Sequence, residues 1–177
     1  MASAFGHGIA AIAIGKVFPA KYAGWKFWLL GVTCSILPDA DVISFSFGIP
    51  YEHLLGHRGI THSFFFAFLL AALVVKLFFA DVRLLSKEGM ILFVCFFLCT
   101  ASHSILDAMT TGGRGVAFFA PFDNTRYFLP WRVIKVSPLS VSSFFSEWGW
   151  RVLKSEIIWI GIPSMAVILA AEFLKKK

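Results

Sequence analysis

Histidines and aspartates recur in short polar stretches that interrupt an otherwise apolar chain. The stretches are LPDAD (residues 37–41), HRGITHS (57–63) and SHSILD (102–107), and a further histidine lies near the N-terminus. Imidazole and carboxylate groups without a thiolate at the same level are ligands that zinc, manganese and magnesium accept. The residues that we expect to bind a divalent metal ion are His7, Asp39, His57, His62, His103 and Asp107.

The spacing within these stretches supports ligation. His103 and Asp107 are four residues apart, so on a helix they project from the same face, one turn from each other. Asp39 and Asp41 follow Pro38, and we expect them at a fraying helix end where a kinked backbone aims both carboxylates inward. One or two ions, zinc first and manganese or magnesium as alternatives, fit this ligand set.

Each feature also has a simpler explanation when taken alone. His7 among glycines and alanines would serve as a hydrogen-bond partner between helices. PDAD would form a turn, and Thr61 or Ser63 would cap a helix. His53 lies four residues before His57 but in a polar loop, where solvation explains it. The meeting of several such features at one end of the chain's apolar segments favours a shared site.

Composition places the chain among membrane proteins. Of its 177 residues, 58% are hydrophobic and 15% are charged, and the mean hydropathy is +0.79. Soluble domains carry about 25% charged residues. The net charge of +6 comes from Lys and Arg residues dispersed around the apolar runs, which indicates topology signals and argues against a nucleic-acid partner. The three cysteines lie inside apolar runs, where packing explains them, although Cys99 is four residues before His103.

Five apolar stretches come close to the length of about 20 residues that a membrane-spanning helix needs. They predict an all-α fold, a polytopic membrane helical bundle of about five transmembrane helices, in a single domain of residues 1–177. The first stretch is the weakest, because His7 and Lys16 interrupt it and Pro19 ends it. The expected spans are 4–20, 24–43, 60–80, 88–108 and 155–174.

Basic residues assign the two sides of the membrane. They gather in the loop between the first two spans, in the loop between the third and fourth, and in the C-terminal tail, and the positive-inside rule places these regions in the cytoplasm. The candidate metal ligands then fall on the outer side. The basic residues in question are Lys16, Lys21, Lys26, Lys76, Arg83, Lys87, Lys175, Lys176 and Lys177.

A long outer connection, about residues 108–154, is also rich in basic residues and so disagrees with that rule. Long loops follow the rule less strictly, and basic groups there could bind a substrate. Its segment VSSFFSEWGWRVL (141–153) has the Trp and Phe content of an interfacial amphipathic helix. We expect this helix to lie over the outer end of the bundle.

Charged residues next to the candidate ligands suggest catalysis. A bound metal ion lowers the pKa of water towards neutrality and polarises a phosphoryl oxygen. Asp41, or Asp39 if the metal does not fully engage it, would take the proton from the attacking water. Arg58 and Arg114, with Arg126 as a further candidate, would neutralise the phosphate oxygens. The stretch TTGGRG (110–115), which contains Arg114, is equally well explained as a flexible turn.

In their order along the chain, these motifs resemble a known family. An N-terminal histidine followed by LPDAD, HRGITHS, HSILD and GGRG...APF is similar to the YdjM-like family of bacterial membrane-bound predicted metal-dependent hydrolases, over about residues 5–130. That family is distantly similar to the zinc-dependent phospholipase C and P1 nuclease group, helical enzymes that hydrolyse phosphoesters with a metal cluster. The resemblance implies that His103 and Asp107 form the His-x-x-x-Asp pair of that group. It also implies that Asp39 and His62 match its isolated aspartate and histidine. The second pair of that group, His-x-x-x-Glu, does not occur further along this sequence.

We therefore expect a membrane-embedded metal-dependent hydrolase of the bacterial cytoplasmic (inner) membrane, with its site on the periplasmic side. Because an amphiphile reaches an interfacial site most easily, the expected substrate is a phosphoester of a lipid or lipid-linked molecule. The expected partners are then the lipid bilayer and this amphiphilic phosphate-containing substrate. The alternative is a transporter or channel-like protein that binds a metal ion without hydrolysis. It predicts polar residues that continue to the cytoplasmic side, whereas the inner halves of these helices are mostly apolar.

Overall fold

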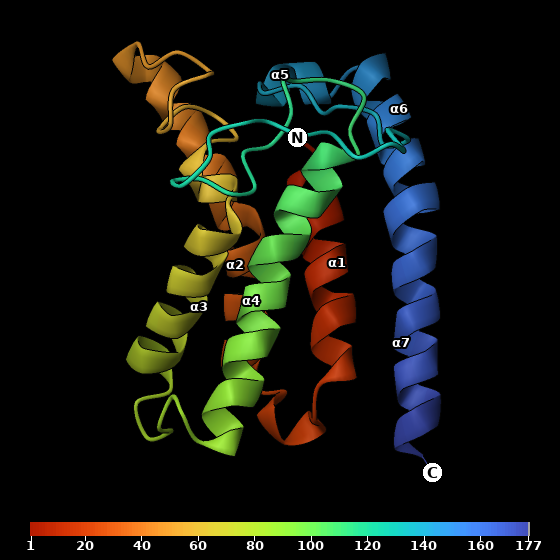
Figure 1. Cartoon of the computed structure of the whole chain (residues 1–177). Coiled ribbons are helices and arrows are strands. Elements are labelled where there is room, and N and C mark those ends of the chain that lie inside the picture. Colours follow the sequence, from red (N-terminus) through yellow and green to blue (C-terminus); the bar gives the residue numbers. More distant parts are fainter. Residues whose placement is uncertain (177) are drawn as a thin grey trace.

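A computed structural model describes residues 1–176, and its regular structure in that range is helical. The described residues contain isolated β-bridges but no sheet, which confirms the all-α prediction. Five apolar helices run side by side, with the N-terminus and the C-terminus at opposite ends of the bundle (Figure 1). These helices are α1 (Ala4–Val17), α2 (Trp25–Ile36), α3 (Phe64–Phe78), α4 (Lys87–Ala108) and α7 (Ile162–Lys175).

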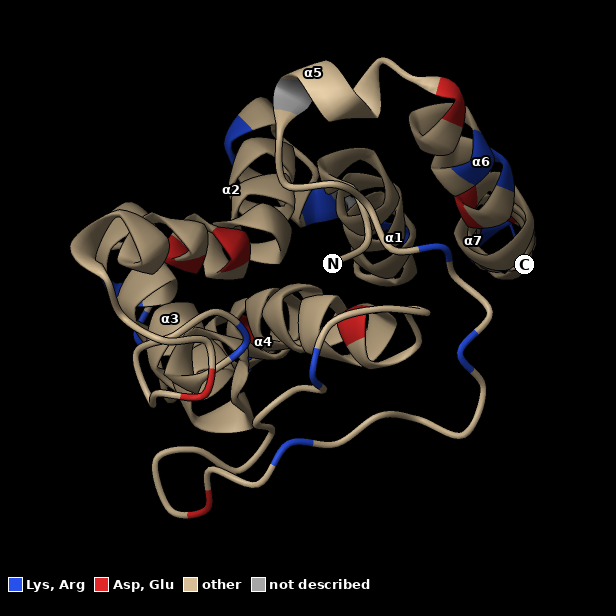
Figure 2. Ribbon diagram, turned by 90° about the horizontal axis from the view of Figure 1, so that it is seen from above, with Lys and Arg blue, Asp and Glu red and all other residues tan. Residues whose placement is uncertain are grey.

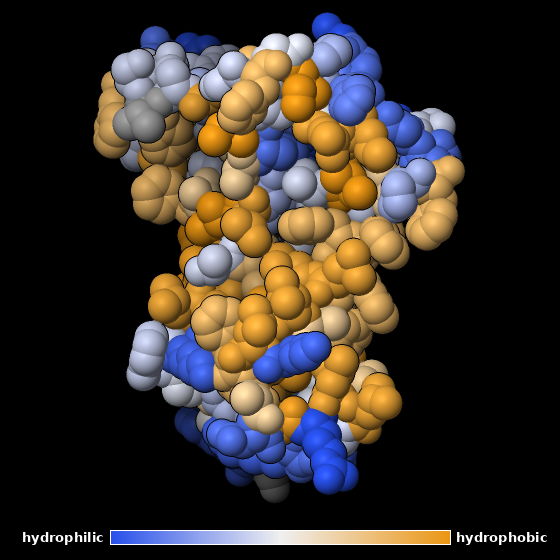
Figure 3. Space-filling model, turned by 90° about the vertical axis from the view of Figure 1, so that its left-hand side faces the viewer, coloured by the Kyte–Doolittle hydropathy of each residue, from blue (hydrophilic) through white to orange (hydrophobic). Residues whose placement is uncertain are grey.

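Three helical stretches within residues 1–176 are long and apolar enough to cross a membrane: Trp25–Phe47, Lys87–Ala108 and Glu147–Lys175. The helices α1 and α3 have 14 and 15 residues. At 1.5 Å per residue they reach about 21–23 Å, which is less than the hydrocarbon core of about 30 Å. Figure 3 shows an apolar surface between two hydrophilic ends on one face of the molecule, as a membrane protein requires.

The second apolar stretch departs from the expected helix over 24–43. The α-helix ends at Ile36, and the chain continues as the 3-10 helix η2 (Leu37–Phe47) with Pro38 near its start. Runs of this kind longer than three or four residues are uncommon. With three residues per turn, Asp39 and Asp41 point about 120° apart, so they face different partners. The backbone is thus a regular 3-10 helix rather than a frayed end, but both carboxylates point inward as predicted, since both are buried and each lies beside one ring nitrogen of His62.

The third apolar helix begins later than predicted. Gly59 precedes a single 3-10 turn, η3 (Ile60–His62), and α3 starts at Phe64 rather than at residue 60. Ser63 is the N-cap, and its side chain accepts a hydrogen bond from the Phe66 amide at 3.0 Å. In the HRGITHS motif, Ser63 therefore caps the helix while the adjacent His62 belongs to a polar cluster.

The amphipathic segment of the long connection is also placed differently. After the short α5 (Val141–Phe144), the helix α6 (Glu147–Glu156) continues through a π-helical turn, η4 (Ile157–Gly161), into α7. The helical stretch Glu147–Lys175 has 29 residues, and at 1.5 Å per residue it is about 43 Å long. It therefore exceeds the hydrocarbon core, so most of the amphipathic segment is the first part of the last long helix, and its first residues form the separate α5. Figure 2 shows the rest of the connection running along one side of the bundle.

The half of the bundle away from the N-terminus has an apolar core. Phe27, Val75, Leu92 and Phe96 are buried there together with the three cysteines, all of which are free. The Cys99 thiol lies 3.9 Å from the Ala11 carbonyl oxygen, within this core. The packing explanation for the cysteines is consistent with this placement.

A buried carboxylate fastens the last helix to the N-terminus. Glu156 is 3% exposed, and it accepts hydrogen bonds of 2.5 Å from both the amide and the hydroxyl of Ser3. Gly6 allows the close approach, since a Cβ at this position would lie 2.9 Å from Ile160. Small residues at helix contacts permit such packing inside membranes.

Loss of this contact will destabilise the protein. Glu156→Ala leaves the Ser3 groups buried without an acceptor, and we expect a loss of about 1–3 kcal/mol in the free energy of unfolding. Glu156→Gln, which keeps an acceptor oxygen, will lose less. Thermal unfolding in detergent measures both variants, and an alanine variant as stable as the wild type would contradict the assignment.

Candidate metal centre

Four of the predicted ligands lie together at the N-terminal end of the bundle. Asp39 comes from η2, His62 from η3, and His103 and Asp107 from the last two turns of α4. One ligand atom from each lies within 4.8 Å of the others, and all four residues are buried. Segments separated by up to 68 residues of sequence thus meet at one point, which is what a metal site requires.

His62 is the centre of this cluster. Its Nε2 lies 2.9 Å from Nε2 of His103 and 3.6 Å from Oδ1 of Asp39. Its Nδ1 faces the other way, 3.1 Å from Oδ2 of Asp41. Asp41 and His57 form with His62 a second group of possible ligands. His62 therefore presents one ring nitrogen to each group.

Hydrogen bonds fix the orientation of the α4 ligands. Nδ1 of His103 donates to the Ser35 carbonyl oxygen at 2.7 Å, so its Nε2 is left to face the cluster. Such a bond from the second ring nitrogen orients histidine ligands in metal sites. Asp107 accepts a hydrogen bond of 2.6 Å from the Ala2 amide through Oδ1. No sequence pattern pointed to the Ser35 carbonyl or the Ala2 amide, because every residue type carries the same backbone groups.

His7 lies against the four ligands. Its ring stacks on that of His103 with the centroids 3.8 Å apart. Its Nε2 is 3.4 Å from Oδ1 of Asp107 and 3.9 Å from Oδ2 of Asp39. His7, which was also predicted as a ligand, therefore reaches the cluster from α1.

The carboxylate of Asp41 is already engaged by neighbouring groups. Oδ1 lies 2.6 Å from Nδ1 of His57, and Oδ2 accepts from the Thr61 hydroxyl at 2.6 Å and from the Arg58 amide at 3.0 Å. Thr61 was considered only as a helix cap, although its position directly before His62 was a signal for a role in the site. The contacts of Asp41 are those of a group that orients histidines.

Arg58 is completely buried beside the cluster. Its Nε lies 2.9 Å from Oδ2 of Asp107, and its two terminal nitrogens donate to the Thr110 hydroxyl and the Gly112 carbonyl oxygen at 3.0 and 3.1 Å. Arg58 has a φ of 61°, a conformation that costs about 1–3 kcal/mol in a residue other than glycine. Gly113 is required next to it, since a Cβ there would lie 2.5 Å from the guanidinium.

Other candidates lie outside the cluster. The side chain of Arg114 is 65% exposed and pairs with Glu52, so the structure does not bring it to the ligands. His53 is exposed, and its Nδ1 accepts a hydrogen bond from a nearby backbone amide. Arg126 donates to the carbonyl oxygens of His57 and Tyr51 at 2.8 and 2.7 Å. Arg126 thus holds the loop that carries His57.

The donor set of the cluster fits a divalent cation. Both ring nitrogens of His7 and both carboxylate oxygens of Asp39 are buried without a hydrogen-bond partner. Burying such groups is costly unless something satisfies them. Imidazole nitrogens and carboxylate oxygens are ligands of zinc, manganese and other first-row ions. The two groups of buried residues could therefore hold a metal ion.

Arg58 and Arg114 will differ in their effect on stability. Arg58→Met leaves the buried carboxylate of Asp107 without its cation, and we expect metal-free protein to lose about 3–5 kcal/mol. Arg114→Met removes an exposed ion pair and will cost about 1 kcal/mol or less. Denaturant unfolding of metal-free protein in detergent makes the comparison. Equal stability of the two variants would show that Arg58 is not the counter-ion of Asp107.

Comparison with known proteins agrees with these features. Residues 1–177 match the family described as YdjM inner membrane protein. The inner membrane protein YbcI of Escherichia coli (strain K12) is 38% identical over 165 residues, which are 92% of each chain. No solved structure matches the chain. The apolar helices and these matches identify an integral inner membrane protein, and the chain belongs to the YdjM inner membrane protein family.

Proposed function

We propose that the protein is a membrane-embedded metal-dependent hydrolase, formed by residues 1–177 as a single domain, that cleaves a phosphoester of a lipid or lipid-linked substrate. The observation that carries the proposal is the buried set Asp39, His62, His103 and Asp107, whose ligand atoms lie within 4.8 Å of one another. Ionisable groups inside membrane proteins are rare and normally functional. One or two divalent ions, with zinc as the first choice, suit these ligands.

The residues divide into ligands and positioning groups. His62 and His103 would bind the ion through Nε2, with Asp39 and Asp107 as oxygen ligands and His7 beside them. His57 would complete a second group if two ions bind. A bound ion would supply Lewis-acid chemistry, lowering the pKa of water towards neutrality and polarising the scissile phosphoester.

Proton transfer falls to Asp39 in this scheme. Both of its oxygens are free of hydrogen bonds, whereas both oxygens of Asp41 are engaged. Asp39 would bind the ion through one oxygen and accept the proton of the attacking water on the other, and Asp41 would hold the rings of His57 and His62. Arg58 would balance charge behind Asp107, while Arg114 would meet a phosphate only after leaving Glu52.

The arrangement in the membrane follows from the basic residues. In Figure 1 the loop between α1 and α2 and the loop between α3 and α4 lie at the end opposite the cluster. These loops contain Lys21 and Arg83, so the positive-inside rule supports a cytoplasmic position for that end. We therefore propose that the cluster lies on the periplasmic side and that all five apolar helices cross the membrane. A head group of an amphiphile in the outer leaflet lies near this depth.

The rival function is a metal-binding transporter or channel-like protein. A transport path needs polar groups through the membrane. Below the cluster, however, the core consists of apolar side chains and cysteines, including Leu92, Phe96 and Cys99. A polar cluster that stops above an apolar core supports catalysis over conduction.

Metal content gives the first test. Purified wild-type protein will contain zinc or manganese in stoichiometric amounts, and His103→Ala and Asp39→Ala will lose it because each removes a buried ligand. His53→Ala is the matched control, since His53 is exposed on the same side, and it will keep the metal. Elemental analysis of detergent-purified proteins measures this. Wild-type protein without metal after supplementation would overturn the proposal.

Hydrolysis gives the second test. Metal-loaded protein reconstituted in vesicles of phosphatidylethanolamine and phosphatidylglycerol will release a phosphorylated head group and leave diacylglycerol in the membrane. His103→Gln will reduce the rate by about 100-fold or more, since the metal-assisted path is lost. His53→Ala will be unaffected. A loaded wild type that cleaves neither these lipids nor lipid-linked pyrophosphates would reject phosphoester hydrolysis and leave only metal binding.

A further inference from the structure

The four ligands of the cluster differ in how they meet their surroundings. The side chains of His62, His103 and Asp107 have no exposed surface, whereas the side chain of Asp39 keeps 8%. His57 and Arg58, which contact Asp41 and Asp107, are buried as well. Of the four ligands, Asp39 therefore lies nearest to the protein surface, although both of its carboxylate oxygens are buried.

Asp39 lies in the wall of an apolar groove. The groove has a volume of about 400 Å³, and the rest of its lining comes from α2 and the start of η2. The other lining residues are Val32, Thr33, Ile36, Leu37 and Ala40. The carboxylate oxygens of Asp39 are buried on the cluster side of this wall, so the groove runs beside the cluster and suits a molecule with an apolar body and a polar head.

The groove faces the membrane rather than the aqueous phase. It belongs to the stretch Trp25–Phe47, which is apolar and long enough to span, and Leu29, Leu37 and Ile43 are exposed on it. The rise per residue places Asp39 about 20–25 Å from the start of α2, within a hydrocarbon core of about 30 Å. The groove beside Asp39 is thus open at a depth that lipids occupy.

We propose that this groove is a lateral entrance through which a membrane lipid reaches the metal cluster. The hydrocarbon chain lies against Val32 and Ile36, and the phosphate head group would be attracted by the metal ion that Asp39 helps to hold, because a carboxylate alone repels a phosphate. This inference rests on the proposed function and makes it more specific, because it selects substrates that diffuse within the bilayer over substrates dissolved in water.

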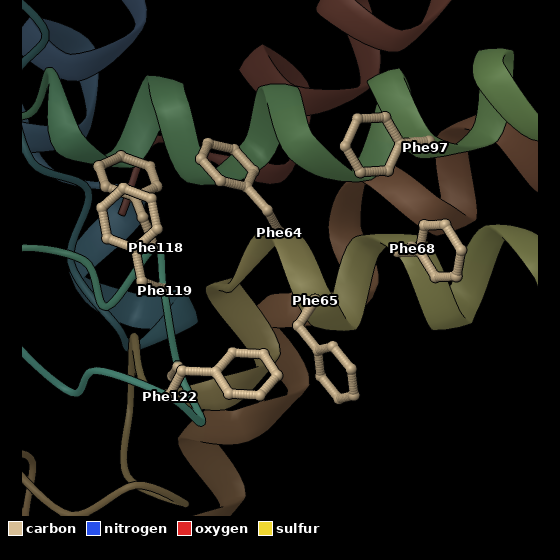
Figure 4. Close-up of a pocket in the computed structure, with 8 residues that line it drawn as sticks. Phe64, Phe65, Phe68, Phe97, Phe118, Phe119 and Phe122 are labelled. Carbon is tan, nitrogen blue, oxygen red and sulfur yellow. The ribbon is translucent and has the colours of Figure 1, made fainter.

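A second groove provides an internal comparison. It has a volume of about 500 Å³ and lies between α3, α4 and the connection after α4. Figure 4 shows its phenylalanines, which include Phe64, Phe68 and Phe97. Its lining contains none of the cluster residues. It faces the same apolar environment without leading to Asp39, so substitutions there serve as matched controls.

Chelator access tests the entrance without requiring hydrolysis. Zinc-loaded protein in lipid nanodiscs is mixed with excess EDTA, which stays in water, or with 1,10-phenanthroline, which partitions into lipid. We expect phenanthroline to remove zinc at least about tenfold faster than EDTA does, which corresponds to an activation barrier lower by roughly 1.4 kcal/mol. Thr33→Trp and Ala40→Trp fill the groove at exposed positions, and each will slow the removal of zinc by phenanthroline by a similar factor. Phe68→Trp in the second groove will leave the rate unchanged.

The outcomes separate the entrance from the hydrolase proposal. Equal starting zinc content in all variants shows that the tryptophans have not unfolded the site. If EDTA strips zinc as fast as phenanthroline and the groove variants behave like Phe68→Trp, the lateral entrance is rejected. If the groove variants slow phenanthroline but no lipid phosphoester is cleaved, the entrance stands and the hydrolase assignment fails.

Discussion

The burial of three carboxylates at one end of an apolar bundle is the constraint on which the structure depends. Asp39, Asp41 and Asp107 are each 8% exposed or less. Buried charges are tolerated only when paired or when they coordinate a metal. Arg58 supplies one cation to Asp107, and histidine rings surround the other two carboxylates. The ring nitrogens of His7 and the carboxylate oxygens of Asp39 have no hydrogen-bond partner, and a divalent cation could bind such atoms.

Much of the backbone around the cluster serves this constraint. The chain adopts an unfavourable φ at Arg58 so that the guanidinium reaches Asp107 while its amide reaches Asp41. Arg126 holds the same loop from outside through the carbonyl oxygen of His57. Several basic residues in the long connection after α4 conflict with the positive-inside rule. Arg126 shows that some of them have structural partners within the protein. Arg132, for example, donates to the Thr110 carbonyl oxygen. These partners explain why basic residues occur in this connection under the proposed orientation.

The sequence predicted the fold class and most of the cluster. Residue types and helical spacing singled out His103 and Asp107, and the order of motifs brought in Asp39 and His62, because ionisable residues are conspicuous in apolar segments. The roles within the cluster were harder to predict. Asp41 was expected to act as a base, but its hydrogen bonds with His57 and Thr61 favour a positioning role.

Composition and periodicity by themselves determined an all-helical membrane protein with imidazole and carboxylate groups at one end, because burial in lipid restricts where charged side chains can occur. Only the tertiary structure decided which atoms face one another. The 3-10 geometry of η2 separates Asp39 from Asp41, and the Ser35 carbonyl turns the His103 ring towards His62. These choices depend on backbone groups and on contacts across long sequence separations, and neither is encoded in local spacing.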